Sequence, residues 1–227
     1  MLVKVNCFGN DIIIPECDTF IKQVIAATGE WEKNVHEAYK SFLTKDSIVI
    51  EVGAHVGTHT IPMAKLAKHV YTFEIQNFIH QLLCFNCINN ECFNVTNFFE
   101  GVSNTTTTLP IEEINYDRPF NTGLMSLESL KKPWGYPLLV TKLDERCKFL
   151  QRCDLIKIDA EGFDTEVIDG AKNLIMQHKP RIMVEFHDEV DKGKMQKLLP
   201  QYKWEDLLDY YKSVKNKMMI GVYDTSA

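Results

Sequence analysis

The chain has 227 residues, 45% of them hydrophobic and 25% charged, the composition of a globular domain that can bury a core of useful size. Its net charge of −6 excludes the strongly basic surface with which proteins usually bind DNA or RNA, so we expect no nucleic-acid partner. No apolar run reaches the length of about 20 residues that a membrane helix needs, and residues 1–10 lack the pattern of a signal peptide. The seven cysteines are an odd number, which favours free thiols; we therefore expect a cytoplasmic protein without membrane contacts.

The first 45 residues contain two short predicted elements. Apolar residues alternate over residues 2–14 around Gly9-Asn10, which predicts a β-hairpin. Residues 18–28 have helical spacing, with Phe20, Val24 and Ile25 on one face. We expect residues 1–45 to form an extension that covers one side of the core, and residues 46–227 to form the main part of a single structural domain.

Strands and helices alternate from residue 46 onward. The continuous apolar run at residues 48–52 is typical of a parallel strand that is buried on both faces, and we expect further strands at residues 70–73 and 95–99. A helical pattern follows Gly57, and a second one begins near Phe78. This alternation predicts βαβ units and a parallel sheet.

Residues 103–137 interrupt this rhythm with threonines, glycines and four prolines, which predicts an irregular segment. Such a segment could form a wall of the acceptor site or a plain surface insertion. The regular pattern then resumes. We expect a strand at 154–159, a helix at 166–176, a strand at 181–186 and two antiparallel closing strands at 204–208 and 218–222.

The first candidate site is Glu51-Val-Gly53-Ala-His55-Val-Gly57, at the end of the first buried strand. Glycines at this position let a ligand approach the backbone, and the next helix begins with free N–H groups. The spacing differs from the Gly-x-Gly-x-x-Gly dinucleotide fingerprint. An acid before the glycines would repel a pyrophosphate but suits an ammonium or sulfonium group. A purely structural strand-to-helix turn is the alternative.

Two further positions complete a nucleoside-binding pattern. Glu74 ends the next strand about 20 residues later, where an acid accepts hydrogen bonds from ribose hydroxyls. Gly101-Val102-Ser103 follows the third strand and would border an adenine ring. A solvated glutamate and an ordinary loop are the respective alternatives.

Acids also end the later strands. Asp159 and Glu161, in Lys157-Ile-Asp-Ala-Glu-Gly162, would point into the crevice where open α/β sheets bind ligands. Clustered carboxylates are costly unless they are paired, protonated or metal-bound. A helix N-terminus that favours acids also explains Glu161. After the following strand, Glu185 or His187 could face Asp159, unless this strand end is simply solvated.

With these motifs, the chain resembles the FkbM-type methyltransferase family, whose members use S-adenosylmethionine. The resemblance covers roughly residues 45–190, and Lys157-Ile-Asp-Ala-Glu-Gly162 is its most specific segment. It departs from the family pattern at Glu51, where aspartate is commoner, at His55, where asparagine is usual, and at Ile75-Gln76, where proline often follows the acid.

The resemblance implies a Rossmann-like α/β fold with helices on both faces of a mostly parallel seven-stranded sheet whose last strand is antiparallel. It also implies that Glu51, Gly53 and Gly57 hold the methionine end of the cofactor, Glu74 the ribose, and residues 101–103 the adenine side. The complete set of expected cofactor-binding residues is Glu51, Gly53, Ala54, His55, Gly57, Thr58, Glu74, Ile75, Gly101, Val102, Ser103 and Asp159.

The expected activity is O-methylation of a sugar, a glycan or a small metabolite. A carboxylate or histidine that takes the hydroxyl proton contributes about 10²–10⁴-fold to such a reaction, and we assign this role to Asp159 or Glu161, supported by Glu185 or His187. In a metal-dependent alternative, Asp159 and Glu185 hold a divalent ion such as Mg²⁺. The other hypotheses are an N- or C-methyltransferase, an NAD-dependent oxidoreductase and a catalytically silent nucleoside-binding module.

Overall fold

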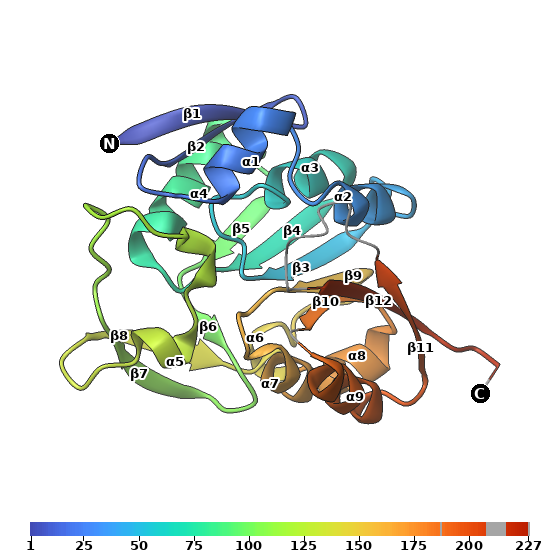
Figure 1. The fold of residues 1–227 in the computed structure, drawn as a ribbon. Coiled ribbons are helices and arrows are strands. Elements are labelled where there is room, and N and C mark those ends of the chain that lie inside the picture. The colour runs from blue at the N-terminus through green and yellow to red at the C-terminus, as the bar shows by residue number, and fades with distance from the viewer. Residues whose placement is uncertain (187, 208–216, 227) are drawn as a thin grey trace.

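A sheet of seven strands forms the centre of the computed structural model, which describes residues 1–186, 188–207 and 217–226 (Figure 1). The strand order is β11-β12-β10-β9-β3-β4-β5. Neighbouring strands are parallel except around β12, which pairs antiparallel with β10 and β11. The fold class and the antiparallel last strand are thus confirmed. The strands are β3 (Ile48–Val52), β4 (His69–Phe73), β5 (Val95–Phe98), β9 (Leu155–Ile158), β10 (Arg181–Phe186), β11 (Tyr202–Leu207) and β12 (Lys217–Tyr223).

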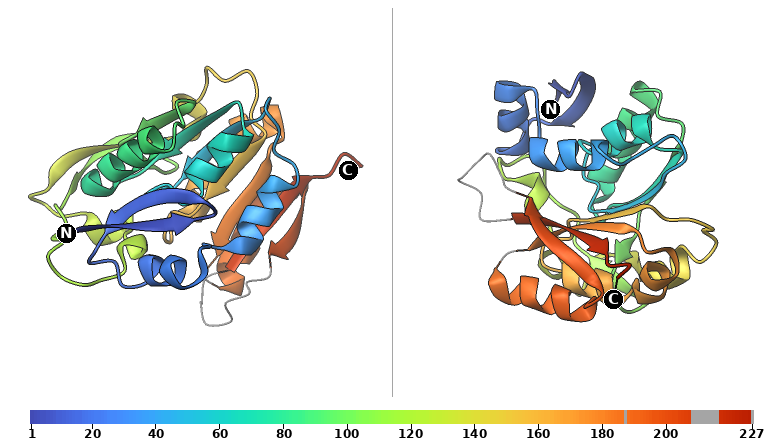
Figure 2. Two further views of the ribbon diagram at one scale, coloured as in Figure 1. Left: turned by 90° about the horizontal axis from the view of Figure 1, so that it is seen from above. Right: turned by 90° about the vertical axis from the view of Figure 1, so that its right-hand side faces the viewer.

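Helices cover both faces of this sheet, which lies between two layers (Figure 2). Alternate strand residues point to opposite faces, so Val49 and Leu155 pack into one core and Ile50 and Ile156 into the other. On the first face lie α1 (Ile21–Thr28), α2 (Lys33–Lys40), α3 (Thr60–Leu66) and α4 (Asn77–Asn89). On the second face lie α6 (Leu143–Arg146), α7 (Asp164–Asp169), α8 (Lys172–His178) and α9 (Glu189–Leu198).

The N-terminal hairpin forms as predicted, from β1 (Leu2–Cys7) and β2 (Asn10–Pro15). Its turn at Phe8-Gly9 has positive φ at both residues, the conformation of the two-residue turns that favour glycine. The inward side chains Val5, Cys7, Ile12 and Ile14 are buried in the same core as helices α1–α4. The hairpin therefore shares a core with the sheet.

The segment at residues 103–137 is more ordered than its composition predicts. β6 (Gly101–Val102), β7 (Thr107–Ile111) and β8 (Tyr136–Thr141) form a second sheet, in the order β6-β8-β7. Pro110 lies opposite Pro137 in this sheet, so its missing N–H group costs no paired hydrogen bond. The prediction of an irregular segment was wrong for β7 and for the short helix α5 (Leu127–Leu130), whose leucines pack on this sheet.

The helix predicted at residues 166–176 is two helices, α7 and α8, that meet near Gly170. A Cβ atom at residue 170 would lie 2.2 Å from the backbone oxygen of Ser103, so close packing against another segment requires glycine at the break. Helices α2 and α9 were not predicted. α9 begins where the Asp188 carboxylate accepts hydrogen bonds from the backbone N–H groups of Val190 and Asp191.

The closing strands β11 and β12 pair as predicted, although Leu208, the last residue of the first predicted closing strand, lies outside the described residues. All seven cysteines lie within the described residues and are free thiols. None of the helices in the described part of the chain combines the length and the apolar character that a membrane span requires.

Candidate active site

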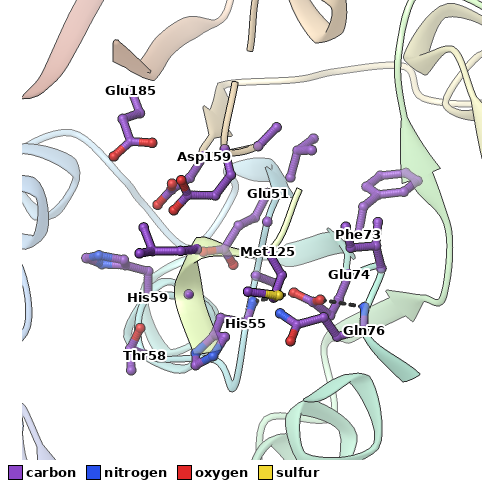
Figure 3. A pocket seen from close by; sticks show the side chains of 18 of the residues that line it. Glu51, His55, Thr58, His59, Phe73, Glu74, Gln76, Met125, Asp159 and Glu185 are labelled. Carbon is purple, nitrogen blue, oxygen red and sulfur yellow. Dashed lines mark hydrogen bonds between the residues drawn. The ribbon is translucent and has the colours of Figure 1, made fainter. Parts of the chain in front are cut away.

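A pocket with a volume of about 200 Å³ opens at the carboxyl ends of β3, β4, β9 and β10 (Figure 3). Its floor is formed by residues at or just after the ends of these strands. Residues of α1 and of the segment 121–127 complete the wall opposite the strand ends. In Figure 3, Glu74, Gln76 and Phe73 lie toward one end, and Asp159 and Glu185 toward the other.

Glu51, near the end of β3, is buried in the centre of the pocket floor. The Thr60 hydroxyl donates a hydrogen bond of 2.5 Å to its carboxylate. Burial raises the pKa of Glu51 to about 7, although the Lys157 ammonium opposes this shift. The next turn needs glycine: Gly53 has a φ of +79°, and a Cβ atom there would lie 1.8 Å from the backbone oxygen of Asp159.

Glu74 follows β4 and connects two loops. One carboxylate oxygen accepts a hydrogen bond of 2.9 Å from the backbone N–H of His55, and the other accepts one of 2.8 Å from that of Gln76. Burial raises the pKa of Glu74 to about 7. The backbone N–H of Ile75 and the side chain of Gln76 also donate to this carboxylate, so Glu74 lies among several hydrogen-bond donors at this end of the pocket.

Lys157 brings a buried positive charge to the other end of the pocket. It lies beside Glu51 in the register of β3 and β9, exposes 1% of its side chain and contacts Asp159 with an Nζ–Oδ2 distance of 3.1 Å. Burial disfavours its charge, but Asp159 and Glu51 outweigh this effect and hold the pKa of Lys157 above its ordinary value. Burial likewise raises the pKa of Asp159, but Lys157 reverses this shift and leaves that pKa lowered.

The remaining two acids, Glu185 and Glu161, have raised pKa values, in contrast to the lowered pKa of Asp159. Burial and the negative charge of Asp159 raise the pKa of Glu185 far above its ordinary value, and the Glu185 carboxyl is hydrogen-bonded to Asp159. Glu185 is therefore protonated at neutral pH and donates to the Asp159 carboxylate. Burial, followed by Asp159, raises the pKa of Glu161 to about 8.

Two histidines also line the pocket. Nε2 of His59 lies 2.8 Å from a carboxylate oxygen of Glu32, and its Nδ1 lies 3.4 Å from the hydroxyl of buried Tyr39. Burial lowers the pKa of His59 and also that of His55, the latter to about 4. Both rings are therefore neutral at neutral pH and place no positive charge beside a cationic ligand.

The structure brings most of the sequence-predicted residues together. The predicted residues that line the pocket are Glu51, Gly53, Ala54, His55, Thr58, Glu74, Ile75, Val102, Asp159, Glu161 and Glu185.

Three predicted cofactor residues lie outside this lining. Gly57 packs close to Leu83, and Gly101 close to Leu127. The backbone N–H of Ser103 donates to the backbone oxygen of Thr141. The fourth predicted catalytic residue, His187, lies outside the described residues.

The pocket side chains that the sequence did not predict include three ionisable ones that take part in its ion pairs, namely Glu32, His59 and Lys157. One signal pointed to Lys157: a lysine inside the apolar strand Leu155-Ile-Lys-Ile158 needs an opposite charge when it is buried. No comparable signal existed for Glu32 and His59, since 27 positions separate them and the helix after Glu32 was not predicted.

The end of the pocket that contains Asp159 suits a hydrogen-bond network better than a metal ion. Asp159, Glu161 and Glu185 each offer an oxygen within 4.8 Å of the others. However, Asp159 already pairs with the Lys157 ammonium and with the Glu185 carboxyl. A cation at this position would therefore have to displace partners that are already in place.

A mostly parallel open sheet with an acid-lined pocket at the carboxyl ends of its central strands defines a Rossmann-like α/β fold, in which this edge is the usual place for a ligand. The profile of the family described as Methyltransferase FkbM domain matches residues 51–216, and the chain belongs to this family. It is thus a member of an S-adenosylmethionine-dependent methyltransferase family. No curated protein sequence matches the chain significantly.

Solved structures confirm the fold at low sequence identity. The methyltransferase FkbM from Methylobacillus flagellatus KT is 15% identical with a TM-score of 0.57; the match covers 79% of this chain but only 44% of that protein. A putative methyltransferase from Streptococcus mutans in complex with SAH is 12% identical with a TM-score of 0.53, covering 84% and 96% of the two chains. Precorrin-6y C5,15-methyltransferase from Geobacter metallireducens GS-15 is 14% identical with a TM-score of 0.54, covering 86% and 89%.

Proposed function

We propose that this protein transfers a methyl group from S-adenosylmethionine to a hydroxyl group of a sugar, a glycan or a small metabolite. One observation carries the proposal: a single pocket joins an end with Glu51 and Glu74 to an end with Asp159, Glu161 and Glu185. The first end suits a nucleoside that carries positive charge. The second offers a proton acceptor to a neutral hydroxyl group.

The residues at the first end fit the cofactor chemically. The Glu74 carboxylate, which lines the pocket after β4, suits the ribose hydroxyls, and the Glu51 carboxylate suits the ammonium group of the methionine part. Apolar side chains beside Glu74, such as Phe73 and Val102, offer contact to an adenine ring. The bound cofactor supplies an electrophilic methyl group on its sulfonium sulfur.

Glu161 is the better candidate for the base that takes the hydroxyl proton. A general base works best when its pKa lies near the working pH, and the pKa of Glu161 is raised to about 8. Asp159 is a weaker base because Lys157 lowers its pKa. In this proposal, the proton of the acceptor hydroxyl passes to the Glu161 carboxylate, while Asp159 and Lys157 keep the acceptor aligned.

The metal-dependent form of the proposal has weaker support, because Lys157 and Glu185 already satisfy Asp159. An N- or C-methyltransferase would use the same cofactor end but needs no base for a hydroxyl proton. A silent binding module would not need a carboxylate with a raised pKa beside the cofactor. The net charge of −6 favours a small molecule or glycan over a nucleic acid as the acceptor.

The test is incubation with labelled S-adenosylmethionine and a panel of sugars, glycans, amines and RNA, with and without a chelator. We expect label to enter a hydroxyl-bearing acceptor with no loss of rate in the chelator. Calorimetry should detect binding of S-adenosylmethionine and not of NAD. Labelling of amines or RNA alone would contradict the proposal, and a protein that binds the cofactor but labels nothing in the panel would favour the silent module.

The assignment of the base has its own test. Glu161→Gln should lower kcat by roughly 10²–10⁴-fold while SAH affinity is retained, and the rate of the unaltered protein should rise as the pH increases through about 8. Asp159→Asn should also lower turnover with the cofactor still bound. Glu166→Gln, outside the pocket, is the control. Full activity of both pocket variants would rule out these roles.

A further inference from the structure

Thr122 lies behind the pocket wall, fully buried, and does not itself line the pocket. Its neighbours Asn121, Gly123, Leu124 and Met125 do line it. Thr122 begins a short 3₁₀ helix, Thr122–Leu124. Its own polar groups point to three other segments of the chain.

The first connection is to the N-terminal segment. The Thr122 hydroxyl donates a hydrogen bond of 2.6 Å to the Asp18 carboxylate, and the backbone N–H of Thr122 donates to the same oxygen at 3.1 Å. The other oxygen of Asp18 accepts from the backbone N–H groups of Phe20 and Lys22, at the start of α1. Because Phe20 and the α1 residues Ile21 and Val24 line the pocket, Asp18 joins two parts of the pocket wall.

The second connection is to the loop after β3. Nε2 of His55 lies 2.8 Å from the Thr122 hydroxyl oxygen. That hydroxyl uses its only proton on Asp18, so it must accept here, and His55 carries its proton on Nε2. Thr122 thereby sets the tautomer and the orientation of a ring that lines the pocket.

The third connection is to the loop after β4. The Gln76 amide donates a hydrogen bond of 3.0 Å to the backbone oxygen of Thr122 and accepts one of 3.0 Å from Tyr116. The backbone N–H groups of Gln76 and His55 both donate to Glu74. In Figure 3, His55, Gln76 and Met125 lie beside Glu74. One threonine is thus connected to two of the residues that hold the Glu74 carboxylate.

We propose that Thr122 is a positioning residue for cofactor binding, which ties the wall segments 18–24 and 121–125 to the His55 and Gln76 loops around Glu74. The inference rests on the cofactor placement proposed above, and it does not depend on the acceptor. Its consequence is that loss of one hydroxyl outside the pocket weakens cofactor binding.

The test is SAH affinity by calorimetry, together with SAH dissociation rate and thermal stability. Thr122→Val keeps the shape and removes the hydroxyl, and we expect roughly tenfold weaker SAH binding through faster dissociation. Thr122→Ser keeps the hydroxyl and should rescue affinity to within about twofold. The matched control is Thr72→Val, because Thr72 is also fully buried and donates to a side-chain oxygen, that of Asn97, at 2.7 Å. It should lose stability with unchanged SAH affinity.

Unchanged SAH affinity in Thr122→Val overturns the inference, and so does an equal loss in Thr72→Val. If Thr122→Val does not fold, Asp18→Asn decides. An asparagine can still cap α1, but its NH₂ group cannot accept from Thr122, so we expect weaker SAH binding, and wild-type affinity overturns the inference. Glu74→Gln separates the two proposals. Unchanged SAH affinity in Glu74→Gln refutes the cofactor placement. Weaker SAH binding in Glu74→Gln, together with unchanged SAH affinity in Thr122→Val, refutes only the role of Thr122.

Discussion

Two charged side chains, Lys157 and Asp159, lie beside the protonated Glu185 carboxyl at the buried end of the pocket. Lys157 holds Asp159 ionised, and Asp159 in turn keeps the Glu185 carboxyl protonated. Oxygen atoms of Asp159 and Glu185 lie within 4.8 Å of each other. Two ionised carboxylates this close would repel each other at low dielectric, so the pair retains one proton. This arrangement connects proton uptake to folding.

The retained proton makes a prediction about stability and pH. The pKa of Glu185 is higher in the folded protein than the ordinary value of 4.5, so its stabilising contribution is complete below about pH 4.5 and is lost as the pH rises toward the folded-state pKa. Glu185→Gln cannot ionise and still donates a hydrogen bond. We expect its melting temperature to fall less than that of the unaltered protein between pH 6 and 9, by roughly a few degrees.

Glu166→Gln is the control for this measurement, because Glu166 lies outside the pocket. A Glu185→Gln variant with the same dependence of melting temperature on pH as the unaltered protein would show that Glu185 does not carry this proton.

At the scale of elements, the ends of three neighbouring strands bring together acids that are distant in sequence. Glu51 belongs to β3, Glu74 follows β4 and Asp159 follows β9. β9 pairs with the free side of β3 after the chain has formed β4 and β5 on its other side. The turn after β3 therefore lies where the strand order reverses, at the usual ligand site of such sheets.

The turn after β3 lies close to the residue that follows β9. We therefore predict that alanine substitutions at Gly53 and Gly162, which both have positive φ, differ in their effect on stability. Gly162→Ala meets no atom within 4 Å and should cost about 1 kcal/mol of unfolding free energy from backbone strain alone. Gly53→Ala places a Cβ atom on the backbone of Asp159 and should lower the free energy of unfolding by more than roughly 3 kcal/mol. This variant should also lose SAH binding. Denaturant unfolding of both variants measures this difference, and equal costs would contradict the contact.

At the scale of the whole molecule, the N-terminal segment is part of both the core and the pocket. Ile12, Ile14, Ile25 and Tyr39 are buried in the core on the α1–α4 face. Phe20, Ile21, Val24, Trp31 and Glu32 line the pocket. The main part of the chain thus depends on the first 45 residues for burial of one sheet face.

We therefore expect that removal of residues 1–45 prevents cooperative folding, because apolar residues on this sheet face, such as Val49 and Leu155, would lose their cover. Circular dichroism and thermal unfolding of residues 46–227 test this expectation. A shortened chain that melts cooperatively and binds SAH would contradict it.

Ligand binding should stabilise the whole domain. SAH at a free concentration 100-fold above its Kd should contribute about 2.7 kcal/mol, which for a domain of this size raises the melting temperature by roughly 5–11 °C. The same concentration of NAD should leave the melting temperature unchanged. Thermal unfolding with each ligand measures both effects, and a shift caused by NAD alone would contradict the proposed cofactor.

Local sequence patterns predicted the elements that form the pocket floor. The strand at 48–52 was recognisable because a strand buried on both faces needs a continuous apolar run. The strands at 70–73 and 181–186 followed from the alternation of strands and helices. The acids at or just after the ends of these strands were candidates because parallel strands end at one edge of the sheet. The resemblance to the FkbM family, carried by the same motifs, supplied the seven strands and the antiparallel last strand, whereas the strand order comes from the structure.

Only the tertiary structure decided which polar groups pair. Thr122 lies 104 positions from Asp18 and 67 from His55, and β7 forms despite its proline because it pairs with β8, a strand that is distant in sequence. Residue periodicity reports which side of an element is buried, since that depends on near neighbours in the chain. The partner of a buried charge or hydroxyl depends on how distant segments pack, and no local pattern encodes that.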